Sequence, residues 1–364
     1  MRILETIPQM GVGGAERVVL DLLTGLEERG HELALVAAPG PLDEQVALPS
    51  GRRVLLEERG RSPLALPGTV RRQGRAIRAF RPEVVHAHGV RVAATAAIAL
   101  RATALRRRPP IVVTFHGVVP SEYRVSARIL GLVDHVVTVS GELAESLERS
   151  GLPRPRLSVI PNGVAAGAEL GHEERARLRR AITGGEGDLV VTAVGRLVPE
   201  KNHARLLDAA RIVVDRRPGT RFLVVGDGAL RPELERRAAE LSLPEVRFLG
   251  MRADARAIIG ASDVVVFSSD SEGMSIAALE AMAAGVPVVS TPATGMIEIL
   301  DGQAGRVAHD FAPATLADCL LELAGDGSAR EAMGAAGRAL VAERHSVEAM
   351  VRGYDELFTR LAGR

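Results

Sequence analysis

The chain has 364 residues, of which 46% are hydrophobic and 25% charged, which suits a soluble protein with two domains of about 150–200 residues each. A single cysteine, Cys319, excludes an intramolecular disulfide, and no apolar run reaches the roughly 18–20 residues of a membrane-spanning helix. Aromatic residues are scarce (two Tyr, seven Phe, no Trp), which argues against base stacking on single-stranded nucleic acid.

The formal net charge of +1 hides an uneven distribution along the chain. Residues 1–185 carry 26 basic and 19 acidic side chains, whereas residues 186–364 carry 20 and 26. This asymmetry favours an anionic partner for the first half. Because Met1 leads straight into a strand-like segment without an apolar signal core, we expect a cytoplasmic protein.

A glycine-rich loop containing Gly13 and Gly14 separates a predicted first strand, Arg2–Ile7, from a helical pattern at Ala15–Arg29. Such a loop lets an anionic ligand approach the backbone at a helix N-terminus. Glu16 stands where a dinucleotide-binding loop would have its last glycine, which counts against NAD. A purely structural tight turn stays open as the alternative.

Strands and helices then alternate through the first half of the chain. This alternation implies parallel βαβ units and a doubly wound sheet, whose ligands bind beyond the carboxyl ends of the strands. The predicted strands are Glu32–Ala37, Val84–His88, Ile111–Phe115 and His135–Val139, and the predicted helices are Gly68–Phe80 and Ala93–Leu105.

Polar side chains stand at the ends of three of these strands. His86 and His88 close one strand, His116 follows the next, and Ser140 follows the third. We expect them to line one cleft, and His116 above all, because Gly117 lets the chain turn away from its imidazole. Zinc binding would need a further ligand, and no carboxylate or cysteine completes a ligand set at suitable spacing in the sequence. A hydrogen-bonded histidine at a strand end is the structural alternative for each ring.

Two arginine-rich stretches, 71–81 and 101–108, supply much of the basic excess. Most such runs are solvated helix faces. The alternative is contact with an anionic membrane surface or a pyrophosphate-bearing acceptor.

Glycine and proline become frequent around residues 151–187, and a second βαβ series follows. We therefore predict an N-terminal domain over residues 1–165, a linker over 166–187 and a C-terminal domain over 188–342. The second series has predicted strands Leu189–Val194, Arg221–Val225, Val246–Leu249, Val264–Ser268 and Val286–Ser290, with helices beginning near Asn202, Ala229, Asp254, Met274 and Ala314.

Lys201 is the only lysine in a chain whose other basic residues are all arginine. It lies with Arg196 at a predicted strand-to-helix turn, where two cations and a helix N-terminus favour phosphate. Lysine supplies a compact point charge and arginine a planar fork, so the two are not interchangeable there. The spacing is not that of a P-loop, which argues against ATP hydrolysis.

Two glutamates, Glu272 and Glu280, stand eight residues apart around a predicted helix start. Helical geometry over that span would place them about two turns apart on one side, with backbone N–H groups at residues 273–275. Such carboxylates can accept hydrogen bonds from hydroxyl groups at two ends of an extended polar ligand.

These motifs resemble those of the retaining glycosyltransferases of family 4, which have the GT-B fold, and the likeness covers nearly the whole chain. The resemblance implies two Rossmann-like, doubly wound α/β domains facing a central cleft, and a final helix over 343–364 that returns to the first domain. It rests on Gly13–Glu16, Thr114–Gly117, Val159–Gly163, Gly195 and Arg196, Glu200–Asn202, Gly226–Gly228, Glu272 and Glu280. Ala165 departs from the family pattern, which often has an acidic residue there.

The resemblance also implies roles for particular residues. Catalytic roles fall to Arg196 and Lys201 on the donor diphosphate, and to Glu272 and His116 on the transferred sugar. Glu16, His86, His88 and Ser140 are expected on the acceptor side. The remaining expected donor-binding residues are Gly13, Gly14, Gly195, Gly226, Phe248, Met251, Gly273, Met274, Ser275 and Glu280.

The expected reaction moves a sugar from a UDP- or GDP-sugar to an acceptor hydroxyl with retention of configuration. Cations and backbone amides already stabilise a leaving diphosphate, so we expect neither a metal nor another cofactor. The acceptor is lipid-linked, at the inner face of an anionic membrane, or a soluble molecule, and we expect no nucleic-acid partner. A nucleotide-sugar epimerase of the same fold and a non-catalytic nucleotide-sugar-binding subunit stay open as alternatives.

Overall fold

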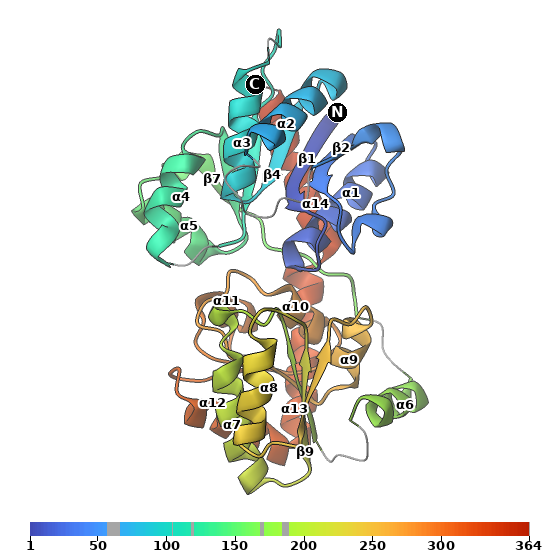
Figure 1. The fold of residues 1–364 in the computed structure, drawn as a ribbon, viewed down its shortest axis with the longest axis vertical. Coiled ribbons are helices and arrows are strands. Elements are labelled where there is room, and N and C mark those ends of the chain that lie inside the picture. Colours follow the sequence, from blue (N-terminus) through green and yellow to red (C-terminus); the bar gives the residue numbers. More distant parts are fainter. Residues whose placement is uncertain (57–65, 104, 118–119, 168–170, 184–188, 364) are drawn as a thin grey trace. The chain divides into compact units, whose positions relative to one another are not determined.

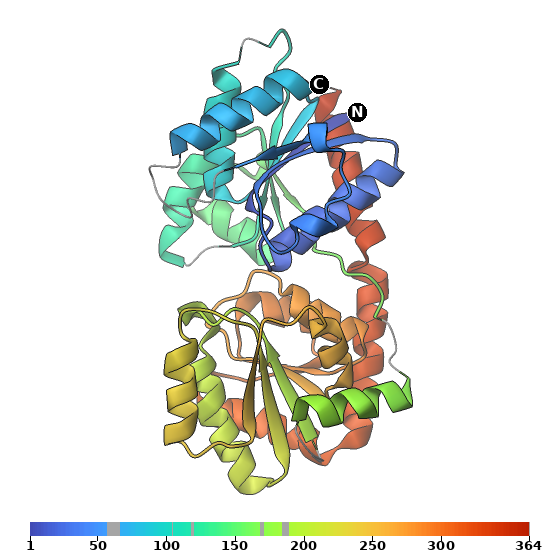
Figure 2. The ribbon, with the colours of Figure 1, turned by 45° about the vertical axis from the view of Figure 1, so that its right-hand side comes forward.

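The computed structural model describes residues 1–364 except 57–65, 104, 118–119, 168–170, 184–188 and 364. It divides into two compact units: the first comprises Met1–Asn162 and Val347–Arg364, and the second Gly163–Ser346. In each unit helices cover both sides of a central sheet (Figures 1 and 2). Both units are therefore three-layered α/β structures.

The described residues of the first unit form a seven-stranded sheet in the order β3-β2-β1-β4-β5-β6-β7, with every pair parallel. The order reverses between β1 and β4, which makes their carboxyl ends the switch point where doubly wound sheets bind ligands. The strands are β1 (Arg2–Gln9), β2 (Glu32–Ala38), β3 (Arg53–Leu55), β4 (Val84–His88), β5 (Ile111–Phe115), β6 (His135–Thr138) and β7 (Leu157–Val159).

The helices of the first unit pack in two layers. α2 contacts α3, α3 contacts α4 and α4 contacts α5, whereas α1 packs against the chain's last helix, α14. Tyr354 and Phe358 of α14 are fully buried, so this helix belongs to the first core. The bounds are α1 (Gly14–Glu28), α2 (Leu66–Phe80), α3 (Val90–Arg101), α4 (Tyr123–Leu130), α5 (Gly141–Arg149) and α14 (Val347–Ala362).

The second unit repeats this plan with a six-stranded sheet, among the described residues, in the order β10-β9-β8-β11-β12-β13. All pairs are again parallel, and the switch point lies between β8 and β11. The strands are β8 (Leu189–Val194), β9 (Thr220–Val225), β10 (Val246–Gly250), β11 (Val264–Phe267), β12 (Val288–Ser290) and β13 (Gly305–Val307).

Strand β8 shows why these apolar runs form central strands. Its alternate residues Leu189, Val191 and Ala193 enter one hydrophobic cluster, whereas Val190 and Val194 contribute to another. Both faces of a parallel sheet are covered by helices, so its strands are apolar at nearly every position. This is the pattern from which the strands were predicted.

The second unit carries eight helices within its described residues. They are α6 (His172–Thr183), α7 (His203–Arg216), α8 (Arg231–Glu240), α9 (Ala255–Ala261), α10 (Ile276–Ala283), α11 (Thr294–Leu300), α12 (Pro313–Gly325) and α13 (Gly327–Arg344).

The stretch predicted as a linker, 166–187, contains helix α6. Arg179 of α6 donates two hydrogen bonds, of 2.8 and 2.9 Å, to the carboxylate of Asp263, and Arg175 lies 3.2 Å from the same group. Helix α6 therefore packs as part of the second unit, so the interpretation of this part as a linker needs correction. The glycine-rich end of the predicted linker, 184–187, lies outside the described residues.

Candidate active site

The connection after β8 places Lys201 at the carboxyl edge of the second sheet. Lys201 ends a short 3₁₀ turn, Pro199–Lys201, and Asn202 follows in the left-handed conformation (φ 44°). Asn202 then caps α7, because its side chain accepts a hydrogen bond from the Arg205 N–H group. The left-handed cap, which asparagine tolerates well, ends the turn and fixes the backbone that carries Lys201.

Glu272, in the loop after β11, forms an ion pair with Lys201. Its Oε1 atom lies 2.5 Å from Lys201 Nζ and also accepts a hydrogen bond of 2.7 Å from the Ser269 hydroxyl. The Lys201 and Glu272 side chains are 19% and 7% exposed, so the pair is largely desolvated. Sequence reasoning missed Ser269, although it lies in the polar run before Glu272.

Two hydrogen bonds to backbone carbonyls hold the connections that carry this ion pair together. The Asp270 N–H group donates to the Glu200 carbonyl at 2.9 Å, and the Ser268 hydroxyl donates to the Lys201 carbonyl at 3.0 Å. The β8 and β11 strand ends thus form one rigid edge at the switch point. A preorganised cation and carboxylate can bind a phosphate and a polyol without large rearrangement.

Two glycines after β9 let their turn approach the β8 connection. Gly226 has a φ of +139°, and a Cβ there would overlap the Gly195 carbonyl oxygen. A Cβ at Gly228 would likewise overlap the Leu197 carbonyl oxygen. The structure therefore gives Gly226 and Gly228 a packing role, and the expected contact of Gly195 and Gly226 with a donor stays a prediction.

Arg196, the second expected phosphate ligand, is more exposed than Lys201. Its side chain is 58% exposed, and among the described residues it forms one long ion pair, of 3.5 Å, with Glu200. An exposed pair of this kind contributes little to stability, which leaves the guanidinium able to reorient.

Glu280 lies in helix α10 and forms an ion pair that the sequence did not reveal. Its Oε1 atom accepts a 2.6 Å hydrogen bond from Nε of Arg256, which comes from α9. Helix α10 begins only at Ile276, after the N-cap Ser275, so Glu272 precedes the helix and the two glutamates are not two helical turns apart. Gly273 and Met274 lie in the same loop.

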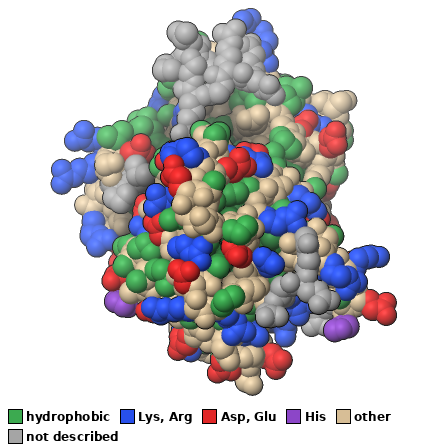
Figure 3. Space-filling view, turned by 60° about the horizontal axis from the view of Figure 1, so that its bottom comes forward, with side chains coloured by type: hydrophobic (Ala, Val, Ile, Leu, Met, Phe, Trp, Pro, Cys, Tyr) green, Lys and Arg blue, Asp and Glu red, His purple; other side chains and the backbone are tan. Residues whose placement is uncertain are grey.

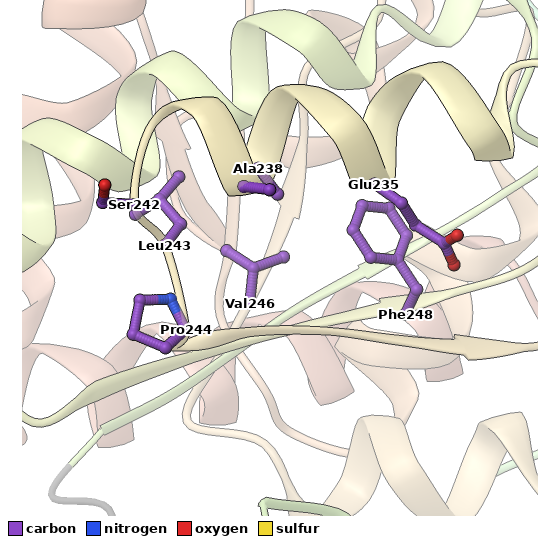
Figure 4. A pocket seen from close by; sticks show the side chains of 8 residues that line it. Glu235, Ala238, Ser242, Leu243, Pro244, Val246 and Phe248 are labelled. Atoms are coloured by element: carbon purple, nitrogen blue, oxygen red, sulfur yellow. The ribbon is translucent and has the colours of Figure 1, made fainter.

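Two residues expected near the nucleotide base differ in their surroundings. The Phe248 side chain lines a groove of about 410 Å³ between α8 and β10, beside Glu235 and Val246 (Figure 4). Its ring is partly buried against the hydrophobic cluster that includes Leu234 and Ala238 of α8, and its expected contact with a nucleotide base stays a prediction. Met251, just after β10, is 56% exposed.

In the first unit, Glu5 of β1 lies beside two histidines of β4. Glu5 pairs with His86 in the parallel register, and His88 is two residues further on the same face. The Glu5 carboxylate accepts hydrogen bonds of 3.0 Å from His86 Nδ1 and from His88 Nε2. Glu5 is thus the carboxylate that the sequence analysis did not find, and with the two histidines it offers three ligand atoms within 4.8 Å.

Hydrogen bonds extend this cluster to β5 and α14. The Thr114 hydroxyl lies 2.7 Å from His86 Nε2 and 2.7 Å from the Tyr354 hydroxyl. Both His86 nitrogens are therefore engaged inside the core, and His86 is fully buried. This corrects the expectation that His86 lines a cleft.

Charge in this cluster is set by burial and mutual contact. Burial alone would raise the pKa of Glu5. Electrostatic attraction to His86 and His88 and the hydrogen bonds that they donate lower this pKa to about 2. Burial, together with the adjacent His86, lowers the pKa of His88 to about 4. At neutral pH Glu5 is an anion and His88 is neutral.

His116 lies directly after β5, at the edge of this cluster. Its Nε2 atom is 3.4 Å from His88 Nδ1. Burial and the neighbouring His88 and His86 hold the pKa of His116 well below its usual range. Gly117, with a φ of +104°, turns the chain away immediately afterwards, as the sequence predicted.

The glycine loop after β1 is covered by Glu16 from the first turn of α1. A Cβ at Gly13 would lie 2.6 Å from a Glu16 carboxylate oxygen. Gly14 is the first residue of α1. The carboxylate thus lies against the loop, which agrees with the argument against a dinucleotide.

Ser140 is a helix cap. Its hydroxyl accepts a hydrogen bond of 3.4 Å from the Leu143 N–H group at the start of α5, and its exposure is 0%. The structure explains this serine by capping, which corrects its expected placement on an acceptor surface.

Two family matches cover most of the chain. Residues 12–166 match Glycosyltransferase Family 4, and residues 188–326 match Glycosyl transferases group 1. A phosphatidyl-myo-inositol mannosyltransferase of Propionibacterium freudenreichii is 30% identical over 323 residues, which are 82% of this chain and 78% of that protein. The chain belongs to glycosyltransferase family 4.

A second relative of this family 4 chain matches over a shorter range. A GDP-mannose-dependent monoacylated alpha-(1-6)-phosphatidylinositol monomannoside mannosyltransferase of Corynebacterium glutamicum is 33% identical over 187 residues. The alignment spans 49% of each protein, so the chain matches about half the length of that relative.

Solved structures confirm the fold class. The crystal structure of Anabaena HepE in complex with UDP and glucose has a TM-score of 0.85 to this chain, covers 99% of it and 100% of its own chain, and is 21% identical. At that identity the likeness shows the fold alone. The family 4 chain thus has two Rossmann-like α/β units of the GT-B type.

The surface carries mixed charges. On the face shown in Figure 3, basic and acidic side chains are interspersed. Among the helices of the described residues, none is both long and apolar enough to cross a membrane.

Proposed function

We propose that this family 4 glycosyltransferase moves a sugar from a UDP- or GDP-sugar to an acceptor hydroxyl in glycan or glycolipid biosynthesis. The observation that carries the proposal is the desolvated pair of Lys201 and Glu272 at the β8/β11 switch point. A diphosphate needs a cation and a sugar needs hydrogen-bond acceptors, and this edge supplies both side by side.

Negative charge develops on the departing nucleotide as the glycosidic bond breaks. Lys201, held in place by Glu272, and the reorienting Arg196 would stabilise that charge, with backbone amides before α10 assisting. Two cations at the leaving group remove the need for a metal ion. We therefore propose a metal-independent reaction without another cofactor.

We propose that configuration at the transferred carbon is retained. In that reaction the acceptor attacks from the face that the diphosphate leaves, and a phosphate oxygen takes the acceptor proton. A bond forms between the acceptor oxygen and the transferred carbon, and the bond between that carbon and the phosphate oxygen breaks. No side-chain nucleophile takes part. Glu272 and His116 would bind the transferred sugar.

The relatives support a nucleotide-sugar donor and a glycolipid-type acceptor. One relative's name specifies GDP-mannose and a phosphatidylinositol mannoside, and the HepE structure contains UDP and glucose. We further propose a cytoplasmic protein that works at the inner face of an anionic membrane. Arg71, Arg75 and Arg78 are exposed on α2, opposite its buried Ala76 and Ile77, and suit such a surface.

Incubation with a panel of UDP- and GDP-sugars, with and without EDTA, tests the proposal. We expect one donor to raise the melting temperature and to release nucleotide, with EDTA having no effect, and Lys201→Ala to lose both responses. Arg216→Ala is the control, because the ion pair of Arg216 with Asp318 is exposed. Interconversion of the donor sugar without transfer would instead identify an epimerase. Binding without turnover on any acceptor extract would indicate a binding subunit.

A further inference from the structure

The histidine that follows β5 is linked to the buried carboxylate of β1 through one intervening ring. Glu5 contacts His88 at 3.0 Å, and His88 contacts His116 at 3.4 Å, each through a different nitrogen of His88. A ring whose two nitrogens are engaged in this way transmits the direction of one hydrogen bond to the next.

The direction follows from the chemistry of the first partner. An ionised carboxylate only accepts, so His88 must donate from Nε2 to Glu5. A neutral imidazole carries one proton, so Nδ1 of His88 is then an acceptor. The Nε2 atom of His116 is therefore the donor in the second hydrogen bond, and its Nδ1 atom keeps a free lone pair.

Ring geometry supports a hydrogen bond between the two histidines. Their ring centroids are 5.7 Å apart and their planes differ by 18°. The excess of this separation over the 3.4 Å between the nitrogens equals about the sum of the two ring radii, which is the largest value it can take, so both nitrogens lie close to the line that joins the centroids. The rings thus lie edge to edge in nearly one plane, as a linear N–H···N hydrogen bond requires.

We propose that Glu5 and His88 are positioning residues that hold His116 in the Nε2–H tautomer, so that its Nδ1 atom accepts a hydrogen bond from a sugar hydroxyl. Among the hydrogen bonds of the described residues, His116 takes part through Nε2 and not through Nδ1. That the hydroxyl belongs to a sugar rests on the proposed function. The assignment of the tautomer rests only on the hydrogen bonds that link Glu5, His88 and His116.

A metal ion is the competing use of Glu5, His86 and His88. Against it, the Glu5 oxygens already accept from both histidines, and Thr114 engages the other nitrogen of His86. All three side chains are at most 1% exposed, so water would have little access as a further ligand. The hydrogen-bonded network accounts for every one of these polar atoms.

Nitrogen-15 NMR of histidine-labelled protein tests the tautomer directly. In the wild-type protein we expect His116 to show a protonated Nε2 and an unprotonated Nδ1. In His88→Leu, the side chain neither donates to Glu5 nor accepts from His116, while Glu5 keeps its hydrogen bond from His86. We expect the His116 signals to move to values averaged between the two neutral tautomers. His135→Leu is the control, because it makes the same substitution in the buried strand β6.

Activity provides the second measurement. We expect His88→Leu to lower kcat/KM about tenfold, with nucleotide binding unchanged and thermal stability close to that of His135→Leu. A wild-type His116 protonated at Nδ1, an unchanged tautomer in His88→Leu, or a stoichiometric metal in the purified protein would overturn the inference. These outcomes are read without turnover, so failure of the proposed sugar transfer is recognised separately.

Discussion

Lys201 and Glu272 lie 2.5 Å apart although 71 residues separate them in the chain. They come from the connections after β8 and β11, two strands that are neighbours only because the sheet order reverses there. The topology itself therefore brings together a lone lysine and a glutamate that the sequence could only identify separately.

Replacement of Lys201 by Arg should lower kcat about 10- to 100-fold. The wide guanidinium keeps the charge but does not fit the compact position between Glu272 and a phosphate oxygen. Stability should change by less than about 1 kcal/mol, because an ion pair with Glu272 can persist. Steady-state kinetics and urea denaturation measure the two effects. Arg216→Lys serves as control, and full activity of Lys201→Arg would show that any cation suffices.

Gly226→Ala should destabilise the protein by roughly 2–4 kcal/mol, because it combines a positive φ with a Cβ that overlaps the Gly195 carbonyl. Gly30→Ala is a matched control: φ is +82° there, and nothing lies within 4 Å of an added Cβ. We expect the control to cost about 1 kcal/mol, from backbone strain alone. Equal losses in denaturant titrations would mean that the packing of the two turns does not matter.

Stability should depend on His88 as the pH falls. The folded-state pKa of His88 is lowered from 6.5 to about 4, so the unfolded chain binds a proton first. The contribution of neutral His88 is complete above pH 6.5 and is lost as the pH falls towards 4. It is about 3 kcal/mol, because a pKa difference of one is worth about 1.4 kcal/mol.

Urea titrations between pH 7.5 and pH 4.5 measure this slope. We expect a smaller loss of stability over that range in His88→Gln than in the wild type. His309→Gln is the control, since the His309 side chain is 80% exposed. Parallel curves for His88→Gln and the wild type would contradict the assignment.

The strands were predictable because their residues are buried on both faces. Strands β4, β5 and β8 have the predicted bounds, and most others differ by one or two residues. The three-residue edge strands β3 and β13 were not predicted, since such short segments carry too few apolar residues to show a pattern. The alternation of strands and helices along the chain, together with the family resemblance, predicted the two-unit fold.

The partners of the site residues were less predictable. Glu5 contacts His86 across 81 residues, and Tyr354 joins the same network from the last helix. One signal for Glu5 was present: an acidic residue within an apolar strand of a parallel sheet needs a buried partner. Nothing in the spacing of Arg256 and Glu280 indicates their contact, because it depends on how α9 packs beside α10.

Glu280→Gln should raise the KM for the donor about tenfold with little change in kcat. A carboxylate that binds nucleotide hydroxyls contributes equally to the ground state and the transition state, so its loss weakens binding without slowing the chemical step. Glu280 is paired with Arg256 at 2.6 Å, and that arginine is 46% exposed. Arg256→Ala should therefore leave donor binding intact or tighten it, because the carboxylate no longer has to give up a partner. Initial-rate kinetics on both variants separate the two residues. A fall in kcat at constant KM for Glu280→Gln would place this glutamate in the chemical step instead.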